Sequence, residues 1–554
     1  MQKDFDVCVV GSGAGGGPIA YTLAKAGYSV VVIEKGSWLT EKDFFKDERA
    51  CCLRDGYTSD LKKEQHVIEL EMDEGGWQQE QTRQSSWNLW NGNCVGGSSN
   101  FMSGFFHRLK PMDFKLLSTF GPIEGANVVD WPISYDDLEP YYQKVEEIVG
   151  VSGKVSQHPH AEPRSTANFP YPPTQEHPFA SMIDQSCSVM GINSLTTSRA
   201  ILPTSVNQRN ACSYNGYCGS YGCATGAKGS SRAALLNQAV STGKCQIIAN
   251  TAVHRLICNH KNKITEVECV DSNNRKKHIQ AKIFVIACQA VETSRLLLLS
   301  ANANFPNGLV NNHGQVGKNL LFAGGGAGSG RFDATKLNPK FKQIGTFINR
   351  NIQDWYVIDD PEFGVKQKGG TIDFINIHPN PVIRASRQTS GHNGLLWGKP
   401  LKRKLETHFI DSQYIKIEAF CDWLPINDCF VSLDPVVKDH WNRPVAKTRL
   451  GFHVRNLQVG WYLANKGASV LKQMGAEDVV SFAVGSPPTN LMAGGCRFGD
   501  DPKTSVLNKY CQAHDIDNLF VTDGSFMPNA GSAPYTWTIY ANSFRVADYI
   551  IKQL

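Results

Sequence analysis

A glycine-rich turn near the start of the chain is the first stretch whose residue types and spacing could do chemistry. Gly11, Gly13 and Gly16, with Ala14 between them, fit the pattern G-x-G-x-x-G. The first glycine permits a tight turn, the second lets the backbone approach a pyrophosphate, and the third allows close helix–strand packing. Glu34 follows at the distance where an acid accepts hydrogen bonds from an adenosine ribose. The spacing predicts a dinucleotide site without separating FAD from NAD.

Three cysteines form a second group with chemical potential. Cys212, Cys218 and Cys223 lie close together in a loop of Gly, Ser, Tyr and Asn that can fold back on itself. Thiolates that converge on one point suit iron–sulfur ligation, although the common clusters take four cysteines. A free-thiol loop or a single disulfide explains the same pattern. The loop is therefore a candidate iron–sulfur site with two structural alternatives.

Two further loops carry small and polar residues of the kind that surround a ligand. The loop at 91–100 contains adjacent glycines and serines, for which an ordinary surface loop is the alternative interpretation. The second loop follows an apolar strand at 519–522 and begins with Asp523 and Gly524. Open α/β sheets bind ligands at the carboxyl ends of their strands, so we expect Asp523 to lie at a binding site.

The elements that must position these residues are short apolar strands alternating with helices. The runs 5–10 and 28–33 predict buried parallel strands, joined by a helix that ends at Gly27. Strands resume at Cys245, and a closing helix is expected from 534 to 547. This alternation predicts an α/β fold, α+β overall, with a Rossmann-like unit.

The middle of the chain has a different pattern. Between about 330 and 485, strand-like runs alternate with polar loops, which predicts an antiparallel sheet with a helix near 454–474. The glycine-rich run 324–330 is predicted to be a flexible breaker and a domain boundary. Ser134, followed by two acids, predicts a helix N-cap.

Composition limits the class of protein. The 554 residues are 41% hydrophobic and 19% charged, which is typical of a globular protein with two or more domains. The net charge of +5 is small, and because no block of Lys and Arg stands out, nucleic acid is not the implied partner. The apolar runs are too short to span a bilayer, so we expect no membrane segment. We also expect no signal peptide before the first strand.

These motifs together resemble the glucose–methanol–choline (GMC) oxidoreductase family of FAD enzymes. The resemblance runs nearly end to end and rests on the N-terminal glycines, on the GGSS at 96–99, on WPISYDDLEPYY, and on CRFGDDPKTSVLN with AHDIDNLFVTDGS near the end. It implies a Rossmann-like FAD-binding domain built from separated segments, plus a substrate domain with an antiparallel β-sheet. The cysteine loop is most similar to the gluconate, fructose and FAD-glucose dehydrogenase branch.

The resemblance also implies how the chain divides and which residues bind FAD. The FAD-binding domain would comprise 1–50, 86–150, 200–323 and 486–554, and the substrate-binding domain with its lid segments 51–85, 151–199 and 324–485. The implied cofactor-binding residues are Gly11, Gly13, Ala14, Gly16, Glu34, Gly97, Ser98, Asn100, Met102, Val253, Asp523, Gly524, Tyr535 and Thr536.

The active site departs from the family pattern. The position of the usual catalytic histidine is Leu491, and that of its His or Asn partner is Pro534. Neither side chain can accept a proton, and a positioned base contributes about 10²–10⁴-fold to such a reaction. Asn490 and Tyr535 are the nearby polar residues that we take as candidate catalytic residues, with Asn490 able only to orient a substrate.

The leading functional hypothesis is a dehydrogenase that oxidises a CH–OH group of a sugar, polyol or other alcohol and passes electrons to a carrier rather than oxygen. The loss of both usual catalytic residues favours, as an alternative, a flavoenzyme of altered chemistry such as C–H oxidation or desaturation. A non-catalytic FAD-bearing electron-transfer subunit is the third hypothesis. The branch implies a small subunit and a cytochrome acceptor as partners. We expect a cytoplasmic protein, or a periplasmic one exported with a signal-bearing partner.

Overall fold

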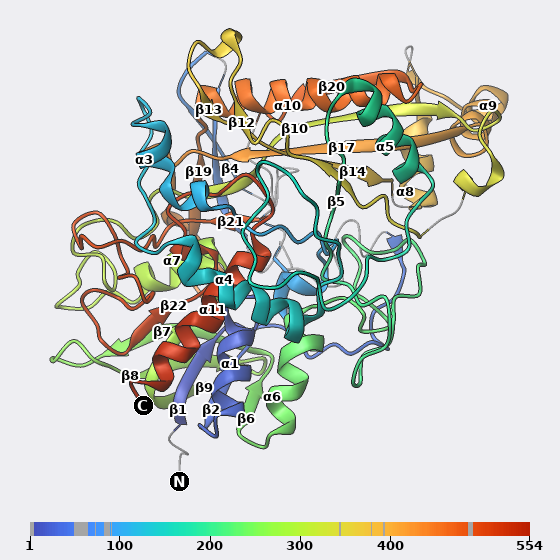
Figure 1. Cartoon of the computed structure of the whole chain (residues 1–554). Coiled ribbons are helices and arrows are strands. Elements are labelled where there is room, and N and C mark those ends of the chain that lie inside the picture. Colours follow the sequence, from blue (N-terminus) through green and yellow to red (C-terminus); the bar gives the residue numbers. More distant parts are fainter. Residues whose placement is uncertain are drawn as a thin grey trace.

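The computed structural model describes residues 5–48, 65–72, 74–81, 89, 91–342, 345–377, 379–391, 394–485 and 491–554. Two large sheets dominate it, with the first in the lower half of Figure 1 and the second in the upper half. The helices are α1 (Gly16–Lys25), α3 (Leu116–Phe120), α4 (Tyr135–Val145), α5 (Phe179–Met190), α6 (Asn237–Ser241), α7 (Ala290–Leu299), α8 (Pro381–Ser386), α9 (Gly398–Phe409), α10 (Val454–Gln473) and α11 (Thr536–Ile551).

The first sheet brings together strands from both ends of the chain. Its path is β6 (Cys245–Ile248), β2 (Val30–Ile33), β1 (Phe5–Val10), β9 (Lys276–Ile286), β8 (Ile264–Asp271) and β7 (Thr251–Cys258), and β22 (Leu519–Val521) also pairs with β9. The pairs of β1 with β2, β1 with β9 and β22 with β9 are all parallel. Their carboxyl ends therefore meet at one edge, as the sequence predicted for a Rossmann-like unit.

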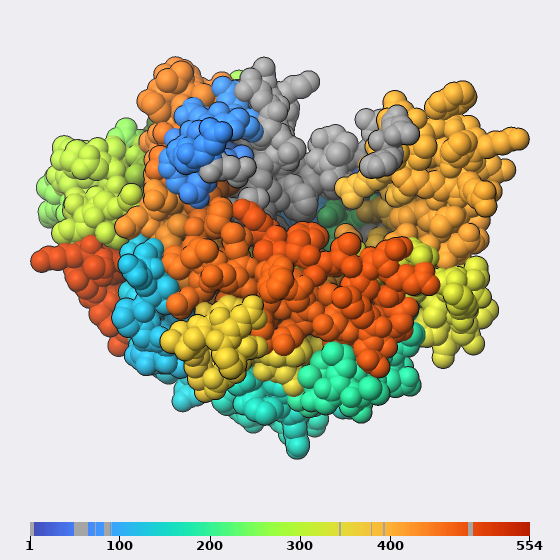
Figure 2. Space-filling view, turned by 90° about the horizontal axis from the view of Figure 1, so that it is seen from above, coloured from blue at the N-terminus to red at the C-terminus, as the bar shows by residue number. Residues whose placement is uncertain are grey.

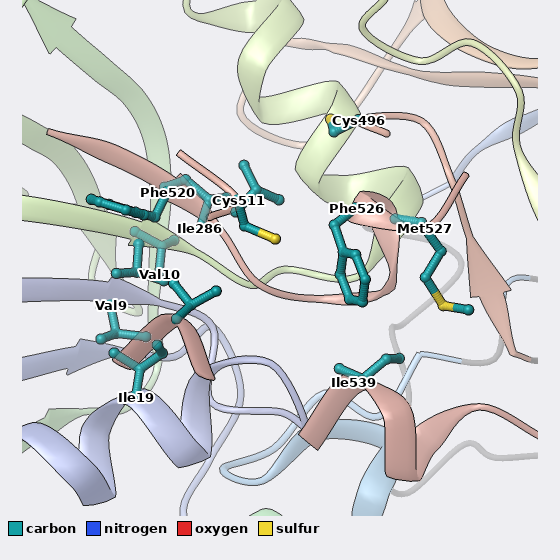
Figure 3. Close-up of a cluster of buried hydrophobic side chains, with 14 of the residues drawn as sticks. Val9, Val10, Ile19, Ile286, Cys496, Cys511, Phe520, Phe526, Met527 and Ile539 are labelled. Carbon is teal, nitrogen blue, oxygen red and sulfur yellow. The ribbon is translucent and has the colours of Figure 1, made fainter. Parts of the chain in front are cut away.

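The core of this region consists of aliphatic and aromatic side chains from segments far apart in sequence. Figure 3 shows Val9 and Val10 of β1 close to Ile19 of α1, Ile286 of β9 and Phe520 of β22. All five side chains are buried. Helix α1 packs against α11, which in turn packs against α4. Because these contacts join the two ends of the chain, the glycine turn after β1 and the segment after β22 are held side by side.

Helix α4 begins as its sequence predicted. The Ser134 hydroxyl accepts a hydrogen bond from the Asp137 N–H, and the Asp137 carboxylate accepts one from the Ser134 N–H at 2.8 Å. This reciprocal pair is a capping box, which satisfies backbone donors at the start of the helix.

The second sheet is antiparallel, as predicted. Its path is β20 (Glu477–Ala483), β10 (Leu321–Asp333), β17 (Ser412–Asp422), β14 (Gly370–Asn376), β11 (Arg350–Ile352) and β5 (Leu195–Thr196), and β21 (Met492–Ala493) pairs with β10. A third sheet contains β18 (Cys429–Lys438), β19 (Pro444–Leu450), β3 (Val67–Glu71) and β4 (Trp77–Gln81), and two small hairpins are β12 (Val357–Ile358) with β13 (Gln367–Lys368) and β15 (Ser390–Gly391) with β16 (Gly394–Leu395).

The predicted flexible breaker at 324–330 is wrong. These glycines lie inside β10, which pairs with β17 on one side and β20 on the other. A Cβ on Gly326 would stand 2.1 Å from the carbonyl oxygen of Gly460 in α10, so the glycines let the helix lie directly on the strand (Figure 1). The expected boundary between 323 and 324 falls within this strand, and the division into domains stays a prediction.

Candidate active site

One cavity of about 720 Å³ connects the carboxyl edge of the first sheet with the inner face of the second. Its lining includes most of the residues predicted to bind the cofactor, together with residues of β10 and β17. The predicted residues that line it are Gly11, Gly13, Ala14, Glu34, Gly97, Ser98, Met102, Val253, Asp523, Gly524, Tyr535 and Thr536.

The glycine turn leaves open space at the start of α1. Gly11 has φ +95°, and a Cβ there would stand 2.3 Å from the carbonyl oxygen of Ala287. Gly13 borders the cavity, and a Cβ on it would meet no atom within 4 Å. Gly16 does not line the cavity, because it packs against the turn, where its Cβ would stand 2.1 Å from the Gly11 carbonyl oxygen. The turn therefore offers backbone N–H groups and a helix N-terminus to an anion.

Glu34 lies at the same end of the cavity and is held by backbone. Its carboxylate accepts hydrogen bonds from the N–H of Ser12 at 3.1 Å and from the N–H of Gly36 at 2.9 Å, and the Ser12 hydroxyl donates a third at 2.5 Å. Burial raises the pKa of Glu34, and these three donors oppose that rise. A carboxylate has about four acceptor positions, so one remains for a ribose hydroxyl.

The loop after residue 91 supplies a second wall. Gly96 and Gly97 have positive φ angles of 94° and 56°, and Gly97 lies against Gly13. Asn100 does not line the cavity, although it is among the predicted cofactor-binding residues. Its side-chain amide instead donates to the carbonyl oxygens of Val95 and Gly97, at 2.9 and 3.1 Å, and so fixes the loop.

Asp523 joins the end of β22 to the start of α7. Its carboxylate accepts hydrogen bonds from the Gln289 N–H at 3.0 Å, the Thr293 hydroxyl at 2.5 Å and the Ser525 N–H at 2.9 Å. Burial raises the pKa of Asp523, and the hydrogen bonds oppose that rise. A Cβ on Gly15 would stand 2.6 Å from the Asp523 nitrogen. Asp523 thus holds the glycine turn and α7 at one edge of the cavity.

The sheet end of the cavity has charged side chains that sequence reasoning missed. Along β17, Ile415 and Ile417 belong to the core beneath α10, whereas Lys416, Glu418 and Phe420 line the cavity. This alternation follows from the two faces of a strand. The polar residues of this strand were visible in the sequence, but which face meets the cavity depends on strand pairing.

Glu418 has a second carboxylate beside it. Asp373 of β14 is its register partner, and Asp373 accepts hydrogen bonds from His107 Nε2 at 3.0 Å and the Thr197 hydroxyl at 3.2 Å. Glu418 is solvent-exposed and borders the cavity. The protein around it reduces its solvation and raises its pKa, while Lys416 lowers the pKa and Asp373 raises it further. The cavity therefore contains a carboxylate whose proton affinity exceeds that of an ordinary glutamate.

Leu491 and Pro534, at the positions of the usual catalytic residues, both line the cavity. Tyr535 lines it too, but its hydroxyl donates to the Leu491 carbonyl oxygen. Burial raises the pKa of Tyr535 well above its ordinary value, and the nearby Asp422 adds to the effect. This shift favours the protonated form of the Tyr535 hydroxyl, and a catalytic role for Tyr535 stays a prediction. Asn490 lies outside the described residues.

The three cysteines of the loop line a separate cavity of about 40 Å³. All three are free thiols, so the disulfide alternative is not present. Burial raises the pKa of Cys212 to about 11. Burial also raises that of Cys223, but Lys228 and hydrogen bonds outweigh it and lower the pKa overall. Within the described part of the chain, no three His, Cys, Asp or Glu side chains are placed to hold a metal ion, and the iron–sulfur site stays a prediction.

Comparison with known proteins identifies the family. Models described as GMC oxidoreductase match residues 32–322 and 425–543, and one described as NAD(P)-binding Rossmann-like domain matches residues 9–40. The chain belongs to the GMC oxidoreductase family, which confirms the predicted resemblance. It is accordingly an FAD-dependent oxidoreductase.

Relatives cover nearly the whole chain. The 2-methyl-1,2-propanediol dehydrogenase of Mycolicibacterium austroafricanum is 28% identical over 99% of this chain and 95% of its own length. The fructose dehydrogenase large subunit of Gluconobacter japonicus is 28% identical over 83% of this chain and 80% of its own, in agreement with the predicted branch. A solved structure of formate oxidase from Aspergillus oryzae covers 100% of this chain and 99% of its own at 15% identity, and its TM-score of 0.66 shows the same fold.

The cavity fits FAD. Open space beside Gly13, the free acceptor position of Glu34 and the wall formed by Gly97 and Ser98 together match a pyrophosphate, a ribose and a flat ring in one continuous space. The individual cofactor contacts stay predictions.

Proposed function

We propose that this protein is an FAD-dependent dehydrogenase that oxidises a CH–OH group of a sugar, polyol or other alcohol and passes the electrons to a carrier rather than to oxygen. Family membership supports the oxidoreductase class. The two relatives named above are dehydrogenases whose names give a diol and a sugar as substrate, which supports the choice of substrate class and of acceptor.

One observation carries the proposal. The glycine cradle and the charged pair Lys416 and Glu418 line the same cavity. Bound FAD supplies the acceptor for the hydride that leaves the carbinol carbon. The hydroxyl proton must go elsewhere, and because Leu491 and Pro534 cannot take it, the chain needs another base.

Glu418 is that base in our proposal. Its carboxylate takes the hydroxyl proton as the C–H bond breaks and the C=O bond forms, so that the alcohol loses one hydride and one proton. Desolvation by the surrounding protein raises the pKa of Glu418, and a higher proton affinity favours proton transfer to its carboxylate. Asp373, held by His107 and Thr197, lies beside Glu418 and raises its pKa further.

Lys416 and the apolar wall have positioning roles. The Lys416 ammonium lies on the same strand face as Glu418, where it can donate to a second hydroxyl of a polyol. Phe420, Leu491 and Pro534 contribute apolar surface to the same wall, where they would limit the access of water to the reacting hydroxyl. A substrate with several hydroxyls on a short carbon chain matches this combination of a charged donor, a base and apolar side chains.

An anaerobic substrate panel tests the function. Purified holoprotein is mixed with polyols, sugars and simple alcohols, and the flavin absorbance is followed. Bleaching by polyols or sugars, followed by reoxidation that is faster with an artificial carrier than with oxygen, supports the proposal. Failure of every alcohol to bleach the flavin would exclude it.

A second candidate is oxidation or desaturation of a C–H bond without an alcohol. The observation in its favour is that apolar Leu491 and Pro534 occupy the usual catalytic positions in the cavity wall. The same panel decides, because substrates without a hydroxyl would bleach the flavin and polyols would not. Bleaching by neither class would favour the non-catalytic electron-transfer subunit.

A partner and a cluster complete the proposal. The name of the fructose dehydrogenase relative, a large subunit, supports a small subunit for this chain as well. A cytochrome acceptor is the partner that the resemblance to the dehydrogenase branch implies. The Lys228 ammonium joins the cysteine loop to the loop at 91–100 by donating to the carbonyl oxygens of Asn100, Cys218 and Tyr221. Iron and acid-labile sulfide in protein prepared without oxygen, lost in Cys218→Ser, would support a cluster on this route. If iron and sulfide are absent, the cysteine loop has only a structural role, in which Lys228 connects it to Asn100.

A further inference from the structure

A lobe at one end of the second sheet has no core of its own. We call residues 379–411 the basic lobe; it contains α8, the β15–β16 hairpin and α9 (Figure 1). None of its described residues, 379–391 and 394–411, is buried. Figure 2 shows this amber region standing out from the body of the molecule.

The lobe concentrates the positive charge of the protein. It contains six Lys or Arg residues and two acids, a net charge of +4, whereas the whole chain has a net charge of +5. Three of the six are consecutive, at 402–404, and the other three are spread over the eighteen positions before them. The cations are Arg384, Arg387, Lys399, Lys402, Arg403 and Lys404.

Large apolar side chains project from the same lobe. Trp397 is 81% exposed, Leu395 79%, Ile410 59% and Val382 58%. They come from the hairpin, from the two ends of α9 and from α8. Each of these side chains would lose contact with water on binding to an apolar phase. Large apolar side chains on ordinary protein surfaces are exposed singly, whereas four of them lie together in this small lobe.

Helix α9 is attached to the body by one face and presents the other outward. Leu401, Leu405 and Phe409, at spacings of four, form the partly covered stripe that faces β17. The guanidinium of Arg384 lies 4.8 Å from the centre of the Phe409 ring. The opposite face carries the exposed cations Lys402 and Arg403.

We propose that the basic lobe binds the surface of an anionic lipid bilayer. Clustered cations attract acidic headgroups, and exposed Trp, Leu and Ile side chains enter the boundary between headgroups and acyl chains. The convex shape favours a fluid bilayer over a protein partner, which would need a matching concave surface. The net charge of the lobe complements a negatively charged surface. No helix in the described residues could span a membrane, so this attachment is peripheral.

The attachment would place the main cavity beside the bilayer. The Ile383 N–H donates to the Glu48 carboxylate at 3.0 Å, and the Tyr221 hydroxyl donates to the Asn380 side chain at 2.7 Å. Ser220, next to Tyr221, lines the main cavity. Lys416, on the strand that follows the lobe, lines it too.

Co-sedimentation of the holoprotein with vesicles tests the proposal. One vesicle preparation is phosphatidylcholine alone, and the other contains one quarter phosphatidylglycerol. We expect binding to the second only, with at least a tenfold loss when NaCl is raised from about 0.05 to 0.5 M, because salt screens exposed charges.

Two lobe variants and two matched controls sharpen the test. Leu395→Ser with Trp397→Ser removes the apolar tips, and Lys402→Glu with Arg403→Glu reverses two cations; each is expected to lower vesicle affinity at least tenfold. The controls are Val436→Ser, whose valine is 80% exposed on β18, and Lys261→Glu with Lys276→Glu. Both are expected to stay within twofold of the parent, and unchanged flavin content verifies folding in all four.

Three results would overturn the proposal. The first is failure of the parent protein to bind phosphatidylglycerol vesicles at low salt, and the second is an equal loss of vesicle affinity in lobe and control variants. The third is a dimer in size-exclusion chromatography with light scattering that Leu395→Ser with Trp397→Ser converts to a monomer, without vesicle binding. That outcome would assign the lobe to contact with a second copy of the chain.

Discussion

The two ends of the main cavity differ in the residues that shape them. At the cradle end, the carboxyl edge of the first sheet, the cavity wall includes the backbone of Gly11, Gly13 and Gly97, supported by the buried carboxylates of Glu34 and Asp523. At the sheet end, the wall is made of side chains such as Lys416 and Glu418.

This difference separates binding from chemistry. A backbone cradle can hold the same cofactor for many substrates, because its shape depends on glycines and strand ends. The side chains at the sheet end can change one at a time without disturbing the cradle. Leu491 and Pro534 at the usual catalytic positions, with Glu418 lining the same cavity, illustrate such a change. We therefore expect substitutions at the cradle end to reduce flavin binding, and substitutions at the sheet end to reduce catalysis or substrate binding.

The largest effect is expected at the cradle end. In Gly13→Ala, the added methyl occupies open space and leaves the fold intact, but it fills the place where a pyrophosphate approaches the backbone. We expect folded protein that purifies with little or no flavin and has no activity. Gly485→Ala, where a Cβ also meets nothing within 4 Å, is the matched control. Full flavin content in Gly13→Ala would place the pyrophosphate elsewhere.

Glu418→Gln is expected to leave the cradle untouched and remove the proton acceptor. Flavin content and thermal stability should stay close to those of the parent, while kcat falls by about 10²–10⁴-fold. Steady-state kinetics with the polyol or sugar found in the substrate panel measures the loss. An unchanged kcat would move the base away from the sheet end.

Lys416→Met should act on binding more than on chemistry. Loss of a charged hydrogen-bond donor costs roughly 1.5–3 kcal/mol, which corresponds to about 10–100-fold in affinity. We expect KM to rise for substrates with several hydroxyls and to change little for simple alcohols. A uniform rise for both classes would argue against a contact with a second hydroxyl.

The smallest expected effect concerns the support behind the sheet end. A Cβ on Gly460 would stand 2.0 Å from the Gly325 carbonyl oxygen, so Gly460→Ala forces α10 away from β10. Overpacking of this kind costs about 1–3 kcal/mol. Thermal unfolding should show a lower melting temperature with flavin still bound. No change would mean that the glycine run 324–330 tolerates a shift of the helix.

Sequence reasoning anticipated the cradle end far better than the sheet end. Gly11, Gly13, Glu34 and Asp523 were predicted from local spacing, because each stands just after a recognisable strand and the structure gathers those strand ends at one edge. Asn100 does not line the cavity, since its amide turns back to Val95 and Gly97, which a local pattern does not show. Its contact with the cofactor stays a prediction.

The sheet end could not be predicted from spacing. Glu418 reaches the cavity through the pairing of β17 with β10 and β14, whose partner residues are distant in sequence. The run 324–330 was misassigned for a related reason. Its glycines are typical of a flexible segment, and only their contact with α10 shows that they permit close helix–strand packing.

The pH dependence of flavin reduction tests the central claim most directly. Anaerobic stopped-flow mixing with the best alcohol substrate would be followed from acidic to neutral pH in the parent and in Glu418→Gln. The pKa of Glu418 is raised above the ordinary value of about 4.3. In the parent, the reduction rate should therefore fall as pH decreases through that raised pKa, because the protonated carboxyl cannot accept the hydroxyl proton. In the variant, the rate should be low throughout and lack this fall. A variant that reduces its flavin at the rate of the parent, with the same fall at acidic pH, would contradict the assignment of Glu418 as the base.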